Sequence, residues 1–184
     1  MEADAAITRI LRFWFEEAGP ALWFNGGDAF DAQVTQVLAA DHVRAVAGEL
    51  DRWRDTAAGC LALCLLLDQA PRNMYRGTAR AFASDFAALA VAEHAVARRF
   101  DLALAEVERV FLYLPFEHAE SLEQQRRCVR LFAGRVADPS YLDFACRHLV
   151  IVERFGRFPH RNAILGRETT AEEAQFLALP GSGF

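Results

Sequence analysis

The segment that decides the fold is AAGCLALCLLLDQA, residues 57–70, which Pro71 follows directly. From Leu61 to Leu67 it is apolar on every side of a helix, and such a helix needs other helices around it. The run is also too short to span a bilayer, which takes about 20 residues. We therefore expect a central core helix that is capped by Thr56 and stopped by Pro71, because proline cannot continue the hydrogen-bond ladder.

Helical periodicity continues on both sides of this segment, with Pro and Gly near the expected ends. We expect helices at about residues 4–17, from 28 onward, and at 57–70, 78–99, 102–113, 119–136, 139–155 and 170–179. No strand-like alternation is longer than a few residues. The pattern predicts an all-α array of about eight antiparallel helices joined as α-hairpins. The consensus Trp, Gly and Tyr positions of tetratricopeptide repeats do not recur.

Within these helices the periodicity predicts particular buried faces. We expect Phe82, Phe86, Leu89 and Val96 to form the buried stripe of the helix at 78–99. We expect Asp101 to cap the next helix and Pro115 to end it, because of proline's missing amide hydrogen. Thr-Ala-Glu-Glu at 170–173 has the spacing of a capping box and predicts the start of the last helix.

Length and composition indicate a single all-helical domain, 1–184. A hydrophobic fraction of 53% is enough for a core without disulfides or metal. The four cysteines, at positions 60, 64, 128 and 146, form no Cys-x-x-Cys pair and have no His at zinc-finger spacing. We therefore expect reduced thiols, no metal and no cofactor. The acidic start MEADAA lacks the basic region of a signal peptide, so we expect a cytoplasmic protein without a transmembrane segment.

Charge is unevenly distributed along the chain. The net charge is −5, and all 20 basic residues are Arg. Residues 121–167 hold nine Arg and four acids, whereas residues 1–120 hold 11 Arg and 18 acids. A basic segment with interleaved Phe and Tyr is suited to RNA. Because the whole chain is acidic and carries no nucleic-acid motif, we do not expect nucleic acid as a partner.

Two turns resemble each other. Arg72-Asn73 and Arg161-Asn162 each follow a proline closely and begin the pattern Arg-Asn-x-x-x-Gly. The glycines, Gly77 and Gly166, are expected to adopt positive φ, and the asparagines to bond their own backbone. The repetition predicts two related halves of the domain, which end at the turns 71–78 and 159–170.

Positive side chains are crowded at these turns. The candidate ligand-binding residues are Arg72, Asn73, Tyr75, Arg76, Arg154, Arg157, His160, Arg161 and Asn162. If the helix at 139–155 persists to Arg157, then Arg154 and Arg157 share one face. Clustered guanidinium groups need a negative counterpart nearby. Inside the protein Asp68, Glu117 and Glu120 could supply it, and the Arg residues would then be structural ion pairs. From outside, a small carboxylate or phosphate could supply it.

The corner Glu117-His118-Ala119-Glu120 holds the candidate acid–base residues. His118 lies between two carboxylates, which can orient and charge an imidazole. The alternative is that Glu117 and Glu120 only favour the positive end of a helix. Hydrolase, metalloprotease and phosphate-loop motifs are absent from the sequence. We expect the two turns and this corner to meet in space around a small anionic ligand, with His118, Glu117 and Glu120 as catalytic candidates.

A second hypothesis is a protein- or peptide-binding module, which is a common role of helical hairpin arrays. Exposed aromatic residues would then line its groove, with Trp23, Phe24 and Trp53 as candidates. In that case the two Arg-Asn turns would be structural only.

Three separated blocks carry a family resemblance: LLLDQAPRNMYRG at 65–77, FLYLPFEHAESLEQQ at 111–125, and RFGRFPHRNAILGRETTAEE at 154–173. Together with the opening FWFEE…WF, they resemble the bacterial DUF924 family of uncharacterised function, which is assigned to the tetratricopeptide-like helical superfamily. The resemblance runs from about Ile10 to Leu177. It implies an all-helical fold and no particular activity.

Overall fold

A computed structural model describes residues 2–182. Over that range the chain forms helices, turns and irregular connections and no strand, which confirms the predicted all-α class. Its α-helices are α1 (Glu2–Arg12), α2 (Pro20–Trp23), α3 (Gly27–Val46), α4 (Ala57–Cys64), α5 (Ala70–Met74), α6 (Asp85–Ala97), α7 (Glu106–Glu117), α8 (Leu122–Arg135), α9 (Pro139–Phe155) and α10 (Ala171–Leu177).

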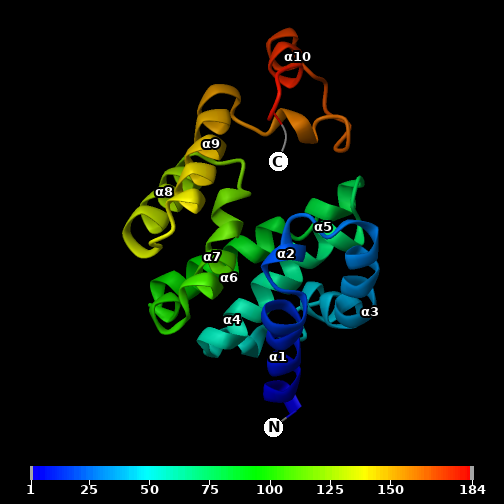
Figure 1. Cartoon of the computed structure of the whole chain (residues 1–184), viewed down its shortest axis with the longest axis vertical. Helices are drawn as coiled ribbons and strands as arrows, with labels where there is room; N and C mark the ends of the chain where they lie inside the picture. Colours follow the sequence, from blue (N-terminus) through cyan, green and yellow to red (C-terminus); the bar gives the residue numbers. More distant parts are fainter. Residues whose placement is uncertain (1, 183–184) are drawn as a thin grey trace.

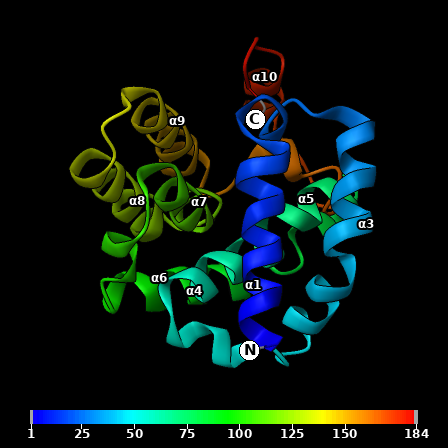
Figure 2. The same ribbon diagram turned by 60° about the horizontal axis from the view of Figure 1, so that its bottom comes forward.

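Helix α4 lies low in Figure 1, beside α1 and below α6 and α7. Helices α1, α6 and α7 pack against α4, and α3 packs against α5. Beyond α7, the chain adds α8 and α9 as successive neighbours. Figure 2 shows α1 crossing the front of the molecule, with α3 on one side and the α8–α9 pair on the other. Helix α10 lies past the end of α9, at the edge of the array (Figure 1).

The central segment is enclosed as predicted. Every residue from Gly59 to Ala70 is buried, including two polar residues at its end, Asp68 and Gln69. Thr56 caps α4 by accepting the amide of Gly59. One continuous apolar core contains this segment and reaches from α1 to α9. Burial against helices on all sides explains why a helix with no polar face is stable here.

The expected stop at Pro71 is wrong, because the helix continues through it to Met74. A π-helical turn, Leu65–Gln69, joins α4 to α5 and places Pro71 in the first turn of α5. Proline is tolerated in a first turn, where its missing amide hydrogen is not needed. π-Helical turns are uncommon and are frequently found at functional sites.

The π-helical turn leaves backbone carbonyls that side chains of other segments take up. Ser84 Oγ donates to the carbonyl of Leu67 at 2.6 Å, and this is the carbonyl that the amide of residue 71 would otherwise bond. His42 Nδ1 donates to the carbonyl of Leu66 at 2.8 Å. Because a buried unpaired carbonyl is unfavourable, these two bonds hold the turn in its shape.

Three further helix predictions need correction. Asp101 does not cap a helix but is fully buried, where it accepts the hydroxyl of Tyr113. Helix α7 begins at Glu106 and runs through Pro115 to Glu117. The predicted helix at 78–99 is divided into a short 3₁₀ segment, Ala79–Phe82, and α6.

This division rotates α6 relative to the predicted stripe. Phe86 is 85% exposed, and the buried positions of α6 are Ala88, Val91, Ala92 and Ala95. Other local predictions are confirmed. Helix α9 has the predicted bounds, the capping box of Thr170 and Glu173 opens α10, and Gly77 and Gly166 have φ of +76° and +64°. No helix within residues 2–182 is long and apolar enough to cross a membrane.

We predict that Ser84→Ala lowers the free energy of unfolding by about 1–3 kcal/mol, because it leaves the buried carbonyl of Leu67 without its hydroxyl donor. Urea denaturation measures the change. Ser121→Ala is the matched control: Ser121 precedes α8 without making a side-chain capping bond, so its removal should shift stability by no more than about 0.5 kcal/mol. Equal effects of the two substitutions would contradict the role given to Ser84.

Candidate functional site

The carboxylate of Asp68 lies at the centre of the candidate site. Asp68 is 0% exposed and sits in the π-helical turn. His118 Nδ1 lies 2.8 and 3.0 Å from its two oxygens, and Gln69 Nε2 donates to it at 2.6 Å. Because an ionised carboxylate only accepts hydrogen bonds, Nδ1 of His118 carries the hydrogen. Within residues 2–182 both hydrogen bonds of the His118 ring use Nδ1, so Nε2 remains the proton-accepting atom.

Two guanidinium groups meet at the same place. Arg72 contacts Asp68 at 3.1 Å and forms a two-pronged pair with Asp85, at 2.8 and 3.0 Å. Arg161 comes from the other end of the chain. Its Nη1 donates to the backbone carbonyl of His118 at 3.1 Å and reaches Asp85 at 3.4 Å. The structure thus brings the first turn, the second turn and the corner at His118 together.

The guanidinium of Arg161 is enclosed but only partly bonded. Arg161 is 6% exposed, and its Cζ lies 4.6 Å from the ring centres of both Phe82 and Phe158. Its Nε is buried and, in the part of the chain that the structure describes, has no hydrogen-bond acceptor. Burial and the charge of Arg72 lower the pKa of Arg161 to about 10. Its one carboxylate contact is with Asp85, which already pairs with Arg72.

Titration at the centre follows from burial and charge together. Burial opposes ionisation of Asp68, but Arg72 and His118 outweigh it and hold the pKa of that carboxyl well below its usual range. The pKa of His118 is lowered by burial and by Arg72, although Asp68 acts in the opposite direction. At neutral pH the pair therefore consists of a carboxylate and an oriented neutral imidazole, which is the form of a general base.

Glu117 faces away from this pair, towards His148 on α9. Its Oε1 lies 3.5 Å from His148 Nδ1, which donates to the carbonyl of Phe144. Burial, together with the charge of Asp68, raises the pKa of Glu117 to about 8. Burial also lowers the pKa of His148 to about 3. His148 is buried, as expected of a core histidine, and its ring centre is 6.4 Å from that of His118.

Glu120 holds the second turn in place. Its carboxylate accepts the amide of Phe158 at 2.8 Å and pairs with Arg167 through two bonds, at 2.6 and 3.0 Å. Arg167 also bonds the carbonyl of Phe158 and the side chain of Asn162. Asn162 is fully buried in this network, so its role here is structural.

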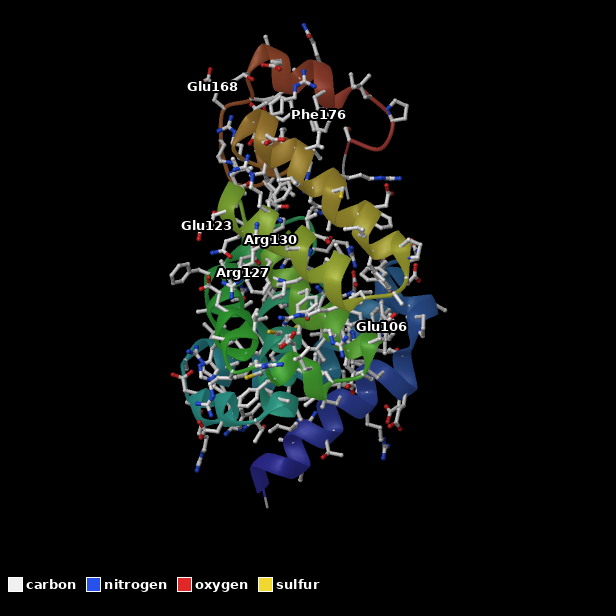
Figure 3. The ribbon with its side chains drawn as sticks, turned by 90° about the vertical axis from the view of Figure 1, so that its left-hand side faces the viewer. Glu106, Glu123, Arg127, Arg130, Glu168 and Phe176 are labelled. Atoms are coloured by element: carbon white, nitrogen blue, oxygen red, sulfur yellow. The ribbon has the colours of Figure 1, made fainter. Side chains whose placement is uncertain are left out.

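The remaining candidates of the second turn point to α10. Arg157 forms a two-pronged pair with Glu173, and Arg154 pairs with Glu172. They do not share a helix face, because α9 ends at Phe155 and Gly156 turns the chain with φ of +70°. Figure 3 shows Phe176 of α10 near the end of α9, where its ring centre is 5.1 Å from that of Phe155. His160 lies beside Phe158, and burial together with Arg161 lowers its pKa to about 4.

The remaining candidates of the first turn point to α3. Asn73 and Arg76 both donate to Asp31, Arg76 through two bonds at 2.6 and 2.8 Å. Tyr75 lies under the guanidinium of Arg80, 3.9 Å from Cζ to the ring centre. These three residues therefore join α3 to the end of α5 and do not face Asp68.

The structure also identifies residues that the sequence did not indicate. The sequence predicts one uninterrupted helix at 78–99 that contains Phe82 and Asp85. The break at Ser84 divides this helix, and both side chains then contact Arg161. Gln69 and Arg167 carried no spacing signal at all. The Asp85 position could have been suspected from its place beside Ser84, which is a residue type favoured where helices begin.

Two surface hollows lie beside α9 and α10 and away from Asp68. One, of about 330 Å³, is lined by Cys146, Arg147, Val150, Ile151, Phe176 and Gly181. The other, of about 340 Å³, is lined by Arg154, Phe155, Arg157, Thr170, Glu172 and Glu173. Among the described residues no group of three or more His, Cys, Asp or Glu side chains is placed to hold a metal ion.

Two aromatic candidates for a binding groove are wrong. Trp23 and Trp53 are buried in the core, because their rings fill space between helices. Trp23 packs on Phe111 with ring centres 4.8 Å apart and donates its indole hydrogen to the carbonyl of Trp14. Of the three aromatic residues named, only Phe24 is exposed.

The cluster and the helix order define an all-helical protein with a buried Asp–His–Arg centre. A family model described as "Bacterial protein of unknown function (DUF924)" matches residues 10–181, so the chain belongs to the DUF924 family and the resemblance is confirmed. A solved structure of a protein of unknown function from Agrobacterium tumefaciens is similar, with 46% identity and a TM-score of 0.91. The match covers 96% of this chain and 98% of that one. A comparison with curated proteins found no match.

We predict that Glu117→Gln becomes increasingly stable relative to the wild type as pH rises. An unfolded Glu ionises near pH 4.5, whereas folded Glu117 keeps its proton up to about pH 8. In that window the folded state binds more protons, so wild-type stability falls by up to about 1.4 kcal/mol per pH unit, and Gln removes this loss. Urea denaturation between pH 5 and pH 8 measures it. The exposed Glu153→Gln is the control, and a pH-independent difference for Glu117→Gln would contradict the prediction.

Proposed function

We propose that the centre around Asp68 binds a small anion through the guanidinium of Arg161. The single observation that carries the proposal is the bonding of that guanidinium. Nη1 is used by His118 and Asp85, whereas Nε and Nη2 have no acceptor within residues 2–182. These two nitrogens form the edge that pairs with two oxygens of a carboxylate or phosphate.

The surroundings of Arg161 support an anion rather than a cation or a neutral group. Asp85, the carboxylate that contacts Arg161, also pairs with Arg72, and Nε of Arg161 is left without an acceptor within residues 2–182. A buried N–H group without an acceptor is unfavourable, and the oxygens of an anion would accept from it. The stacking of Arg161 between Phe82 and Phe158 fixes the plane in which its free edge lies. A rigid fork loses little freedom on binding, and this favours recognition of planar oxygen pairs.

The proposal is for a small ligand. The side chains of Arg72 and Asp85 are each 19% exposed and that of His118 15%, so the cluster reaches solvent along one edge. Arg161 does not line either of the two hollows beside α9 and α10. A ligand that places one carboxylate or phosphate group at the cluster satisfies both observations. We also propose that His118 acts as an acid–base residue on the bound ligand. A location in the cytoplasm is a separate part of the proposal.

The alternative, a protein- or peptide-binding module, has less support. Its two Trp candidates are buried. The basic segment 121–167 is also poorly suited to RNA, because many of its Arg side chains pair with protein carboxylates. These pairs are Arg126–Glu153, Arg127–Glu93, Arg135–Asp101, Arg147–Asp143, Arg154–Glu172, Arg157–Glu173 and Arg167–Glu120.

We predict that acetate or inorganic phosphate raises the melting temperature of the wild type at constant ionic strength, and that Arg161→Met abolishes the rise. A ligand at about 100 times its Kd stabilises the folded state by about 2.7 kcal/mol. Differential scanning fluorimetry measures the shift. Arg161→Lys keeps the charge but loses the fork, so it should retain only a small part of the effect.

Arg154→Met is the matched control, because Arg154 is an exposed arginine of the same region that pairs with Glu172. It should keep the full ligand response. If the wild type, Arg161→Met and Arg154→Met all respond equally, the effect is a general salt effect and the proposed site is wrong. If the wild type does not respond to a series of small carboxylates and phosphates, the proposal also fails.

A further inference from the structure

The charged groups around Asp68 already balance one another. Arg72 and Arg161 carry two positive charges, and Asp68 and Asp85 carry two negative ones. Asp68 and Arg161 are buried, and the other two are largely covered. An anion bound to Arg161 would leave this enclosed cluster with one excess negative charge. Because uncompensated charge is unfavourable away from water, binding requires a compensating proton or cation.

Several titratable groups surround His118, and they belong to all the elements packed around it. They are Asp68 in the π-helical turn, Arg72 on α5, Asp85 on α6, Glu117 on α7, Glu120 after α7, His148 on α9, and His160 and Arg161 in the turn that follows α9. Any proton taken up with an anion must go to one of these or to His118 itself.

Geometry selects His118 among them. Asp68 already accepts hydrogen bonds from His118 and Gln69 and contacts Arg72, so protonation would break a satisfied arrangement. Asp85 and Glu120 are each held by a two-pronged arginine. Glu117 holds its proton at neutral pH, and the pKa values of His148 and His160 are lowered to about 3 and about 4. His118 has an ionised carboxylate on Nδ1, which stabilises the imidazolium that forms when Nε2 is protonated.

We propose that an anion enters this site together with one proton and that Nε2 of His118 is the atom that accepts it. The inference rests on the proposed anion site. When the ligand arrives as an undissociated acid, its O–H bond breaks, the electron pair stays on the ligand oxygen, and an N–H bond forms at Nε2. When it arrives as an anion, the solvent supplies the proton. The ligand class is therefore a weak oxygen acid, a carboxylic acid or a phosphate monoanion.

The π-helical turn fixes the orientation of the His118 ring that accepts this proton. Ser84 and His42 bond two consecutive carbonyls within the π-helical turn, and Asp68 of the same turn contacts Nδ1 of His118. Arg161 bonds the backbone carbonyl of His118, so the anion-binding fork and the proton-accepting ring are joined through one residue. The linkage between anion and proton is then reciprocal: each favours the binding of the other.

The test is isothermal titration calorimetry of the full-length protein with acetate and with inorganic phosphate, in two buffers of different ionisation enthalpy. For acetate, the expected result at neutral pH is the uptake of about one proton per bound anion. The Kd should rise about tenfold per pH unit between the pKa of His118 in the free protein and its higher pKa in the complex, because one proton is linked to binding in that range. Nitrogen NMR of the imidazole should show Nε2 of His118 become protonated when acetate is added to the wild type.

His118→Gln should bind acetate more weakly than the wild type at neutral pH, without proton uptake and with a pH-independent Kd. His94→Gln is the matched control, because the ring of His94 bonds the carbonyl of Arg54 and no group of the cluster. This variant should behave as the wild type. Acetate binding without proton uptake, uptake that persists in His118→Gln, or an unchanged His118 imidazole in the NMR spectrum of the acetate complex would each overturn the inference while leaving the anion site intact. Absence of any binding to the wild type would overturn both.

Discussion

The carboxylate of Asp68 is the interaction on which the rest of the centre depends. It is fully enclosed, yet it is ionised because Arg72, His118 and Gln69 all contact it. A buried carboxylate of this kind is tolerated only when its partners are fixed in place. The π-helical turn fixes the position of Asp68 relative to these partners, because Asp68 lies within the turn at the end of an apolar helix. One segment, residues 59–70, therefore contributes to both the core and the charged centre. Its residues up to Leu67 are apolar, and Asp68 and Gln69 near its end are polar.

Charge balance divides the arginines of this chain into two groups. Arg76, Arg157 and Arg167 are each held by a two-pronged carboxylate and connect helices that are far apart in sequence. Their role is structural, in line with the internal ion pairs considered from the sequence. Arg161 differs, because its carboxylate is shared and the Nε of its guanidinium is buried without an acceptor within residues 2–182. A buried arginine whose carboxylate partner is shared and whose Nε lacks an acceptor is a more specific indication of a binding site than the abundance of arginine.

The sequence predicted the class of the fold and the bounds of α9, because apolar periodicity and helix caps are local signals. It also predicted that the two turns and the corner meet, and Arg72, His118 and Arg161 do lie together. It could not predict which side chain of each turn faces the centre. Arg76 and Arg157 looked equivalent to Arg72 and Arg161, and their directions depend on the break at Ser84 and on the chain reversal at Gly156. The break at Ser84 and the π-helical turn depend on tertiary contacts, whereas the reversal at Gly156 is a local glycine end of α9. The two related halves of the domain stay a prediction.

The position of Arg161 after α9 has a consequence for biosynthesis. The main core is complete once the residues up to Ala145 have packed, whereas Phe158 and Arg161 belong to the segment that follows α9. A chain that emerges from the ribosome can therefore bury most of its apolar surface before its guanidinium fork reaches Asp85. Under the proposed function, the residue that binds the anion is synthesised after the main core, and a chain terminated before Arg161 would be compact but would lack that guanidinium.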